Sequence, residues 1–303
     1  MTIIITLSIA FLLDIIAGDP PNRIHPVAWC GNLIGGIWKK RPIRPAALFG
    51  FGALICAAGL LPAAVVYPVR MLPETASIII TALLFKLTFS LKDLLKAAGK
   101  IRKALDDGHL KEARQLTSRH LVSRDTSGLT EFELSAAVVE SVAENITDSF
   151  TAPLFYFLLL GLPGAWFYRW VNTCDAMLGY RRGDYEWGGK FAARVDDVLN
   201  FIPARITALL IIIAGAGRKN PAESTASVFR NAGRTDSPNA GWSMSAAAAV
   251  LGVRLEKKEH YILNGGARQP EPRDIGDCIR LCRTAAALGG LAVIAAKAAA
   301  YAL

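Results

Sequence analysis

The sequence has few charged residues for its length. Only 19% of its 303 residues are Asp, Glu, Lys or Arg, whereas 52% are hydrophobic and the mean hydropathy is +0.34. Soluble domains are usually about 45–50% apolar. The scarcity of charge, and the collection of the apolar residues in long blocks, argue against an ordinary soluble domain and indicate an integral membrane protein.

Other absences narrow the class of protein further. The first apolar block lacks a basic segment before it and a small-residue cleavage site after it, so we interpret it as an anchor rather than a signal peptide. The five cysteines lack a complete zinc-ligand pattern and are expected to be reduced packing residues. Long alternating runs of apolar and polar residues are missing, so little sheet is expected. The net charge of +9 comes without a nucleic-acid-binding motif, which argues against nucleic acid as a partner.

Apolar blocks are abundant in the sequence. Four of them approach the roughly 20 residues that span a bilayer, namely residues 2–17, 46–69, 75–91 and 284–303. Two less regular blocks cover residues 150–171 and 201–217, and the centre of the first reads LGLPGA, a turn signal that favours a helical hairpin. The sequence predicts an all-α polytopic integral membrane protein with about four to six membrane segments, some of which could be re-entrant, and with cytoplasmic helices.

The placement of Lys and Arg predicts the orientation. Residues 18–45 carry five Lys or Arg against one acid, and residues 92–125 carry nine against five, so the positive-inside rule assigns both to the cytoplasm. We expect a single integral membrane domain over residues 1–303, with a cytoplasmic helical hairpin insertion at 92–130 and a cytoplasmic connection at 218–282. The expected location is the cell membrane, crossed several times, with the active site on the cytoplasmic side.

The stretch VVESVAENITDSF, residues 138–150, carries carboxylates where a helix approaches an apolar block. Positions four residues apart on a helix drift by only about 40° per step, so Glu140, Glu144 and Asp148 form one acidic stripe, with Asn145 beside it. Like charges at this spacing repel each other, so we expect a cation there. Hard oxygen ligands suit Mg²⁺ shared with phosphates. The alternative is a solvated helix face.

A second acidic cluster lies in ARVDDVLNFIPARIT. Asp196, Asp197 and Asn200 fall within about one turn, flanked by Arg194 and Arg205. Carboxylates with Mg²⁺ neutralise phosphate oxygens, and arginines bind the same oxygens bidentately. The alternative is that the two arginines only pair with the aspartates.

Several polar islands accompany the two acidic clusters in a fixed order. They read GDPPNRIHPV, RDTSGL, VESVAEN followed by D and APLF, NTCDAMLGY, ARVDD with NFIPAR, and SPNAGW. In this order and spacing, from about residue 14 to residue 277, they resemble the CbiB/CobD family of integral membrane enzymes of cobalamin biosynthesis, the adenosylcobinamide-phosphate synthases. One departure from the family pattern is Ser243, where proline is expected in many relatives.

The resemblance implies a reaction. Such enzymes join adenosylcobyric acid to (R)-1-aminopropan-2-ol or its O-phosphate through an amide bond, and ATP with Mg²⁺ is expected to activate the carboxylate. The implied partners are the corrinoid, the amino alcohol or its phosphate, and the lipid bilayer. Association with other enzymes of the corrinoid pathway and homo-oligomerisation stay open.

Roles for individual residues follow from the matching motifs as hypotheses. The expected catalytic residues are Asp196, Asp197 and Glu144. The expected metal ligands are Glu140, Glu144, Asp148, Asp196 and Asp197. Substrate or phosphate binding is expected from Asp19, His25, Arg124, Asp125, Ser127, Asn145, Asn172, Asp175, Tyr180, Arg194, Asn200, Arg205, Ser237 and Asn239.

Three other functions remain alternatives at this point. A membrane prenyltransferase also uses Asp-rich helices with Mg²⁺ at the mouth of a helical bundle. A corrinoid transporter would carry ionisable residues near the bilayer midplane, whereas the clusters here lie at segment ends. A membrane scaffold for other corrin enzymes would have no catalytic activity of its own.

Overall fold

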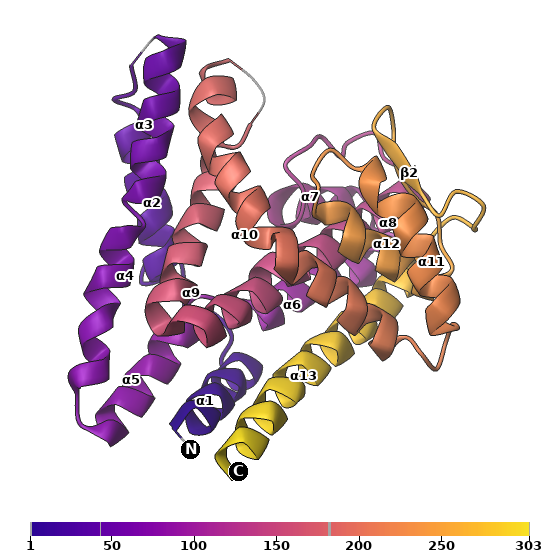
Figure 1. The fold of residues 1–303 in the computed structure, drawn as a ribbon. Coiled ribbons are helices and arrows are strands. Elements are labelled where there is room, and N and C mark those ends of the chain that lie inside the picture. The colour runs from indigo at the N-terminus through magenta and orange to yellow at the C-terminus, as the bar shows by residue number, and fades with distance from the viewer. Residues whose placement is uncertain (1, 43, 181–182, 303) are drawn as a thin grey trace. The chain divides into compact units, whose positions relative to one another are not determined.

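The chain folds almost entirely into helices. The computed structural model describes residues 2–42, 44–180 and 183–302 (Figure 1). Within these residues, extended structure is limited to the short antiparallel strands β1 (Leu255–Lys257) and β2 (Tyr261–Leu263), together with one isolated bridge. The all-α prediction is therefore confirmed.

Contacts divide the chain into two compact units. The first comprises Met1–Ser90, Ala152–Asn200 and Ile294–Leu303, and the second comprises Leu91–Thr151 and Phe201–Val293. The first holds α1 (Thr2–Ile16), α2 (Pro26–Trp38), α3 (Pro45–Ala57), α4 (Leu60–Val66), η1 (Tyr67–Met71), α5 (Glu74–Lys86) and α9 (Ala152–Leu178). The second holds α6 (Leu91–Asp106), α7 (Leu110–His120), α8 (Glu131–Ile146), η2 (Thr147–Thr151), α11 (Pro221–Asn231), η3 (Ala232–Arg234), α12 (Ala240–Leu251), β1 and β2. Helices α10 (Asp184–Ala214) and α13 (Pro272–Ala302) contribute residues to both units.

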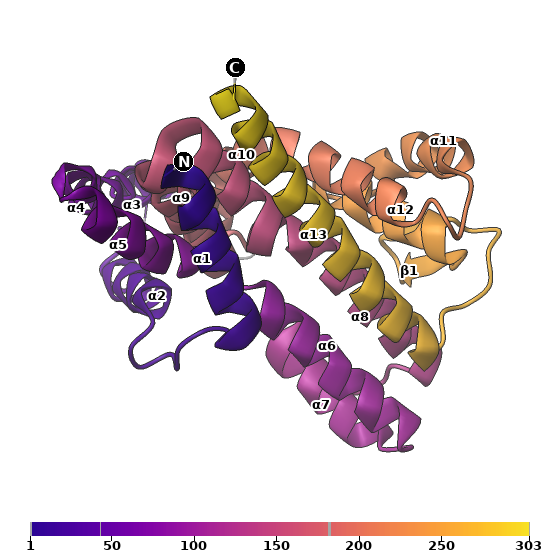
Figure 2. The same ribbon diagram turned by 90° about the horizontal axis from the view of Figure 1, so that it is seen from below.

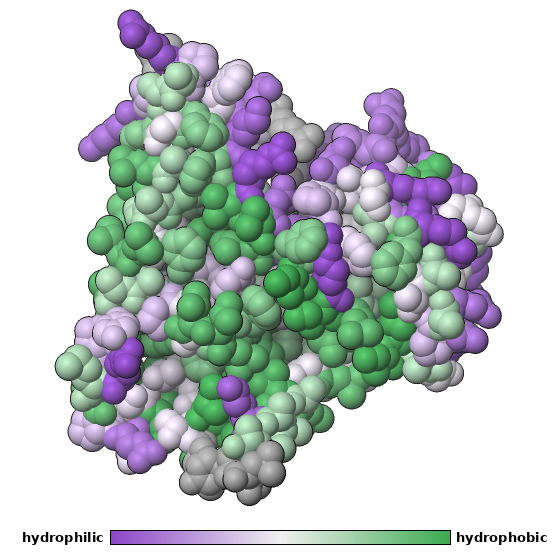
Figure 3. All heavy atoms as spheres, in the orientation of Figure 1, coloured by the Kyte–Doolittle hydropathy of each residue, from purple (hydrophilic) through white to green (hydrophobic). Residues whose placement is uncertain are grey.

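Among the described residues, four helical segments are long and apolar enough to cross a membrane. They are Pro45–Met71, Glu131–Leu178, Asp184–Ala214 and Pro272–Ala300. On the first of them, Leu54, Leu61 and Val65 are 66%, 67% and 77% exposed, and Figure 3 shows hydrophobic side chains covering α3 and α4. Such a surface is stable against lipid rather than water. Helices α1 and α5, by contrast, have only 15 and 13 residues, fewer than the roughly 20 that span a bilayer.

The apolar block at 150–171 turns back on itself. Gly161 has φ 69° and ψ −160°, which interrupts α9. The rings of Tyr156 and Tyr168 stack with centroids 5.3 Å apart, although an unbroken helix would separate residues twelve positions apart by about 18 Å. The Gly-Leu-Pro-Gly sequence therefore produces two packed helical arms, and the predicted hairpin is confirmed.

In the second unit, α6 and α7 form the helix pair expected between residues 92 and 130. Gly108 adopts φ +75° in the turn between them, a conformation that glycine reaches without steric cost. The two helices lie side by side (Figure 2). Helix α8 then begins at a capping box, because Thr130 accepts from the backbone N–H of Glu133 and the Glu133 side chain accepts from that of Thr130.

The first unit pairs the lone charges of two apolar blocks. Lys86 on α5 places Nζ 3.1 Å from Oδ1 of Asp14 on α1 and 2.6 Å from Oδ1 of Asp19. The Lys86 ammonium also donates to the carbonyl of Phe89 at 3.1 Å. The side chains of Lys86 and Asp14 are only 6% and 5% exposed. Because an isolated charge is costly to bury, this lysine cluster (Lys86, Asp14 and Asp19) holds α1 against α5.

His25 lies beside Asp19, the most exposed member of the lysine cluster. Burial acts to raise the pKa of Asp19, but hydrogen bonds from His25, Lys86 and Ser90 outweigh it and hold the pKa well below its ordinary value of 3.8. His25 caps α2 by accepting the Val27 N–H on Nδ1 at 3.1 Å. In the neutral ring the proton is then on Nε2, which lies 3.9 Å from Asp19 Oδ1.

Replacing the central lysine should destabilise the protein strongly. Lys86→Met removes the ammonium that Asp14 and Asp19 share, so we expect a loss of about 3–5 kcal/mol in the free energy of unfolding. Chemical unfolding in detergent micelles, followed by tryptophan fluorescence, measures it. The control Lys40→Met removes an exposed lysine and should change this free energy by less than about 0.5 kcal/mol. Equal effects of the two variants would contradict a role of the buried ion pairs.

Candidate functional site

The acidic stripe is not a single continuous row. Helix α8 ends at Ile146, and Thr147–Thr151 forms a turn of π-helix that includes Asp148. A π-turn is wider than an α-turn and is frequent at functional sites. Its geometry removes the four-residue periodicity on which the prediction for Asp148 depended. Burial separates the remaining two carboxylates, since Glu140 is buried and Glu144 is exposed.

Glu140 is a buried carboxylate with limited compensation. The residue is 5% exposed, and its Oε2 lies 3.4 Å from Nη2 of Arg124. Its other oxygen, Oε1, is buried and accepts no hydrogen bond from the described residues. A buried polar oxygen without a hydrogen bond costs about 1–3 kcal/mol. The site is therefore suited to receive a further cationic or hydrogen-bonding group.

The hairpin β1–β2 brings two residues that the sequence analysis missed close to Glu140. Tyr261 pairs with Lys257 across the two strands. Burial raises the pKa of the Tyr261 phenol, and the nearby carboxylates of Glu140 and Glu144 raise it further. Tyr261 therefore stays protonated and can donate a hydrogen bond, while the ammonium of Lys257 acts electrostatically on Glu140. No motif in the sequence marked these residues.

Two other predicted residues, Asp125 in the loop before α8 and Asn145 on α8, form hydrogen bonds with nearby residues of the same segment. Asp125 accepts from the backbone N–H and from the hydroxyl of Ser127, both at 2.9 Å. These hydrogen bonds lower the pKa of Asp125. Asn145 donates to the carbonyl of Ser141 at 2.8 Å and to its hydroxyl at 3.1 Å. Of this group, Arg124 is the residue that the structure brings directly to the acidic helix.

In the first unit, α9 and α10 join three of the predicted residues in one network. Asp196 accepts from the side-chain amides of Asn200 at 2.9 Å and Asn172 at 3.4 Å. Asn200 in turn accepts from the hydroxyl of Tyr168 at 2.9 Å, and Asn172 accepts from Arg169 at 3.3 Å. Motifs separated by 24 residues in the sequence therefore meet at one carboxylate. Because two amides hold Asp196, its orientation is fixed.

The first unit also holds four other predicted residues, on or next to α9 and α10. Asp197 is half-buried and Arg194 is exposed. Asp175 lies so close to Gly179 that a Cβ there would meet Oδ1 at 2.2 Å, which explains the glycine after α9. Tyr180 makes an edge contact with the Tyr185 ring at 5.9 Å. Their proposed roles in substrate binding remain predictions.

Arg205 in the second unit anchors the SPNAGW loop. Its Nη1 donates to Asn239 Oδ1 at 2.7 Å and to the Phe201 carbonyl at 2.8 Å, and Nη2 lies 3.3 Å from the Pro238 carbonyl. The guanidinium also lies over the rings of Phe201 and Trp242, at 3.8 and 4.5 Å from their centroids. These contacts position the loop and occupy donors that the sequence analysis assigned to phosphate.

Ser237 shapes the same loop. Its hydroxyl oxygen accepts from the backbone N–H of Asn239 at 3.2 Å and from that of Ala240 at 3.5 Å. These bonds satisfy orphan N–H groups at the start of α12. The loop therefore holds the Asn239 side chain against Arg205 through local hydrogen bonds.

The carboxylates do not form a protein-only metal cage. Among the described residues, no group of three or more His, Cys, Asp or Glu is arranged to hold a metal ion. Magnesium commonly binds one or two carboxylates and takes its other ligands from water and phosphate. Magnesium shared between one or two of these carboxylates and a substrate phosphate therefore stays a prediction.

Comparisons with known proteins identify the relatives of this chain. Residues 7–282 match the family model described as CobD/Cbib protein. The cobalamin biosynthesis protein CobD of Dehalococcoides mccartyi is 43% identical over 293 residues, which cover 94% of each chain. The "Probable cobalamin biosynthesis protein CobD" of Thermococcus kodakarensis is 42% identical over 90% of this chain and 88% of its own.

A third relative, carrying the same name in Methanothermobacter thermautotrophicus, is 38% identical over 93% of both chains. No solved structure matches the chain. The family match and these relatives cover nearly the whole sequence, including every cluster described above. The chain therefore belongs to the CobD/CbiB family, in which these curated relatives are named as cobalamin biosynthesis proteins.

Proposed function

We propose that this protein is a membrane enzyme of cobalamin biosynthesis that forms an amide bond. Its substrates would be the carboxylate of adenosylcobyric acid and the amine of (R)-1-aminopropan-2-ol or its O-phosphate. The family membership and the names of the curated relatives support the pathway. The chemistry of the sites described above supports the reaction type.

The reaction needs an activated carboxylate, because an ionised carboxylate would have to expel oxide. We propose that a carboxylate oxygen attacks the terminal phosphorus of ATP, giving an acyl phosphate and ADP. The amine nitrogen then attacks the acyl carbon, and the C–O bond to phosphate breaks. The products are the amide and inorganic phosphate, and the nitrogen loses a proton. Mg²⁺, when bound with the nucleotide, would offset the charge on the phosphate oxygens.

The observation that carries this proposal is the environment of Glu140. A carboxylate oxygen that is buried and accepts no hydrogen bond from the described residues lies beside the guanidinium of Arg124. The protonated phenol of Tyr261 and the ammonium of Lys257 are close by. A phosphorylated intermediate is stabilised by positive groups, whereas an incoming ammonium is stabilised by negative groups, so the reaction needs both kinds of charge. Arg124 and Lys257 would stabilise the phosphorylated intermediate, and Glu140 with Glu144 would stabilise the ammonium or bind a shared metal ion.

The Asp196 network offers a second group of substrate ligands. Its carboxylate is oriented by Asn172 and Asn200, and Asp197 next to it is half-buried. We propose that Asp197 acts as the base that removes the proton from the attacking amine, or holds a second metal ion. The cytoplasmic side, where ATP is available, would be the side of the reaction.

Incubation of the purified full-length protein with adenosylcobyric acid, Mg-ATP and aminopropanol phosphate tests the reaction. Mass spectrometry should detect the corrinoid amide, and omission of ATP should abolish it. If every substrate is recovered unchanged under these conditions, the proposed function is wrong. Uptake of a corrinoid into proteoliposomes without chemical change would instead support a transporter.

The carboxylates should be required for the chemical step. We expect Glu144→Gln and Asp197→Asn each to lower kcat for amide formation by about 10²-fold or more, because removing a general base or charge-stabilising group has costs of this size. Glu131→Gln is a matched control, since Glu131 is exposed on the same helix as Glu144. The control should retain the wild-type rate. Wild-type rates for Glu144→Gln and Asp197→Asn would exclude their assigned roles.

A further inference from the structure

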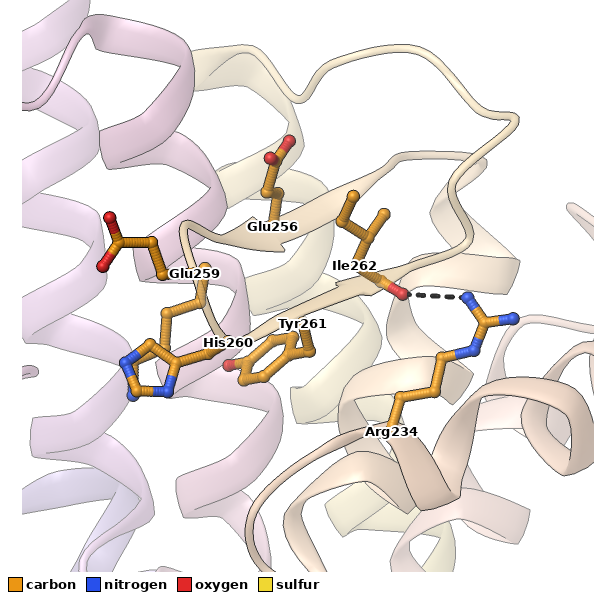
Figure 4. Close-up of a pocket in the computed structure, with 7 residues that line it drawn as sticks. Arg234, Glu256, Glu259, His260, Tyr261 and Ile262 are labelled. Carbon is orange, nitrogen blue, oxygen red and sulfur yellow. Dashed lines mark hydrogen bonds between the residues drawn. The ribbon is translucent and has the colours of Figure 1, made fainter.

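A depression lies on the hairpin β1–β2, in a region to which the sequence analysis assigned no role. Its volume is about 520 Å³, and Figure 4 shows its lining residues. They are Arg234, Glu256, Lys257, Glu259, His260, Tyr261 and Ile262. We refer to it as the hairpin depression. Its size falls within the roughly 300–1,000 Å³ of small-molecule sites, and Figure 3 shows hydrophilic residues gathered over this part of the protein.

The lining offers cationic groups for an anion. Arg234 donates Nη1 to the Ile262 carbonyl at 3.3 Å, which positions the guanidinium at the edge of the depression. This bond uses one of the five N–H donors of an arginine, so a fork of donors stays available for bidentate contacts. Lys257 on β1 adds a second positive charge from the paired strand.

The two glutamates of the lining direct their carboxylates away from Arg234 in Figure 4. Glu256 forms an ion pair with Arg254, whose Nη2 lies 2.5 Å from Oε2. Glu259 lies in the turn between the strands with φ 63°, and its carboxylate points away from Arg234 in Figure 4. His260 is held by Asp236, 3.3 Å from Nδ1, and lies at the opposite end of the depression from Arg234 (Figure 4).

The hairpin depression adjoins the buried carboxylate of α8. Tyr261, which lines the depression, has its phenol near Glu140 and Glu144 and 4.0 Å from the Met244 sulfur. Lys257 lines the same depression and acts on the charge of Glu140. A small molecule bound in the depression would therefore lie against Tyr261 and Lys257, two residues that also act electrostatically on or lie near Glu140.

We propose that the hairpin depression binds the phosphate group of a small substrate, with Arg234 as its ligand and Lys257 as a second positive charge in the same lining. Naming that substrate rests on the proposed function. A phosphate monoester of the amino alcohol and a nucleotide share this chemistry, and both are small enough for the depression. Arg234 would grip two phosphate oxygens through its planar fork, and Lys257 would supply a point charge.

Binding by the full-length protein in detergent micelles tests the site directly. Isothermal titration calorimetry would use three probes separately: inorganic phosphate, O-phosphoethanolamine and a non-hydrolysable ATP analogue. We expect saturable binding of at least one phosphate ester, weakened about tenfold or more by Arg234→Gln and by Lys257→Gln, because hydrogen bonds to charged groups are worth this much. The two variants are independent, so one can carry the test if the other fails to fold.

Lys258→Gln is the matched control. Lys258 neighbours Lys257 in the sequence but pairs with Glu133, 2.5 Å away, and does not line the depression. It should change the affinity by less than about twofold, because it tests the general effect of one lost surface charge. If no phosphate ester binds saturably, or if Lys258→Gln weakens binding as much as the other two, the proposal is overturned.

Kinetics separate the two sources of phosphate and the two proposals. If the depression holds the amino alcohol phosphate, Arg234→Gln raises KM for that substrate and leaves KM for unphosphorylated aminopropanol unchanged. If the depression holds the nucleotide, KM for ATP rises instead. Amide formation with all three KM values unchanged in both variants would overturn the phosphate site and leave the function intact. Phosphate binding that depends on Arg234, without any amide formation, would support the phosphate site and overturn the proposed function.

Discussion

A charged side chain buried among apolar helices is stable only when an opposite charge or hydrogen bonds compensate its lost hydration. The first unit meets this constraint at Lys86, which is shared by Asp14 and Asp19. The second unit meets it incompletely at Glu140, where Arg124 approaches one carboxylate oxygen and the other accepts no hydrogen bond from the described residues. The contrast distinguishes a structural ion cluster from a site that is suited to a ligand.

The same constraint organises the polar residues of α9 and α10. Asn172 and Asn200 hold Asp196, and the buried Tyr168 holds Asn200. The turn at Gly161 makes this network possible, because it reverses the chain and brings Tyr168 back onto the arm that carries Tyr156. The turn at Gly161 thereby helps to position Asn200, which belongs to a motif about 40 residues later in the sequence.

The sequence could predict features that depend on local chemistry. Apolar blocks predicted the helices, and Gly-Leu-Pro-Gly predicted the reversal in α9. It could not predict features that depend on distant contacts. The ion pair of Lys86 with Asp14 joins residues 72 positions apart. The π-turn at Thr147–Thr151 places Asp148 outside a regular α-helix. Arg205 is engaged by aromatic rings and loop carbonyls whose positions cannot be predicted from residue spacing. Tyr261 and Lys257 were missed because a three-residue strand has no recognisable periodicity.

The central claim is that ATP activates a corrinoid carboxylate as an acyl phosphate before the amine attacks. Adenosylcobyric acid labelled with ¹⁸O in the reacting carboxylate tests it most directly, because the attacking oxygen stays with phosphorus when the amide forms. Mass spectrometry of the released inorganic phosphate should show one ¹⁸O atom for each amide produced. Amide formation that releases only unlabelled phosphate would contradict activation through an acyl phosphate.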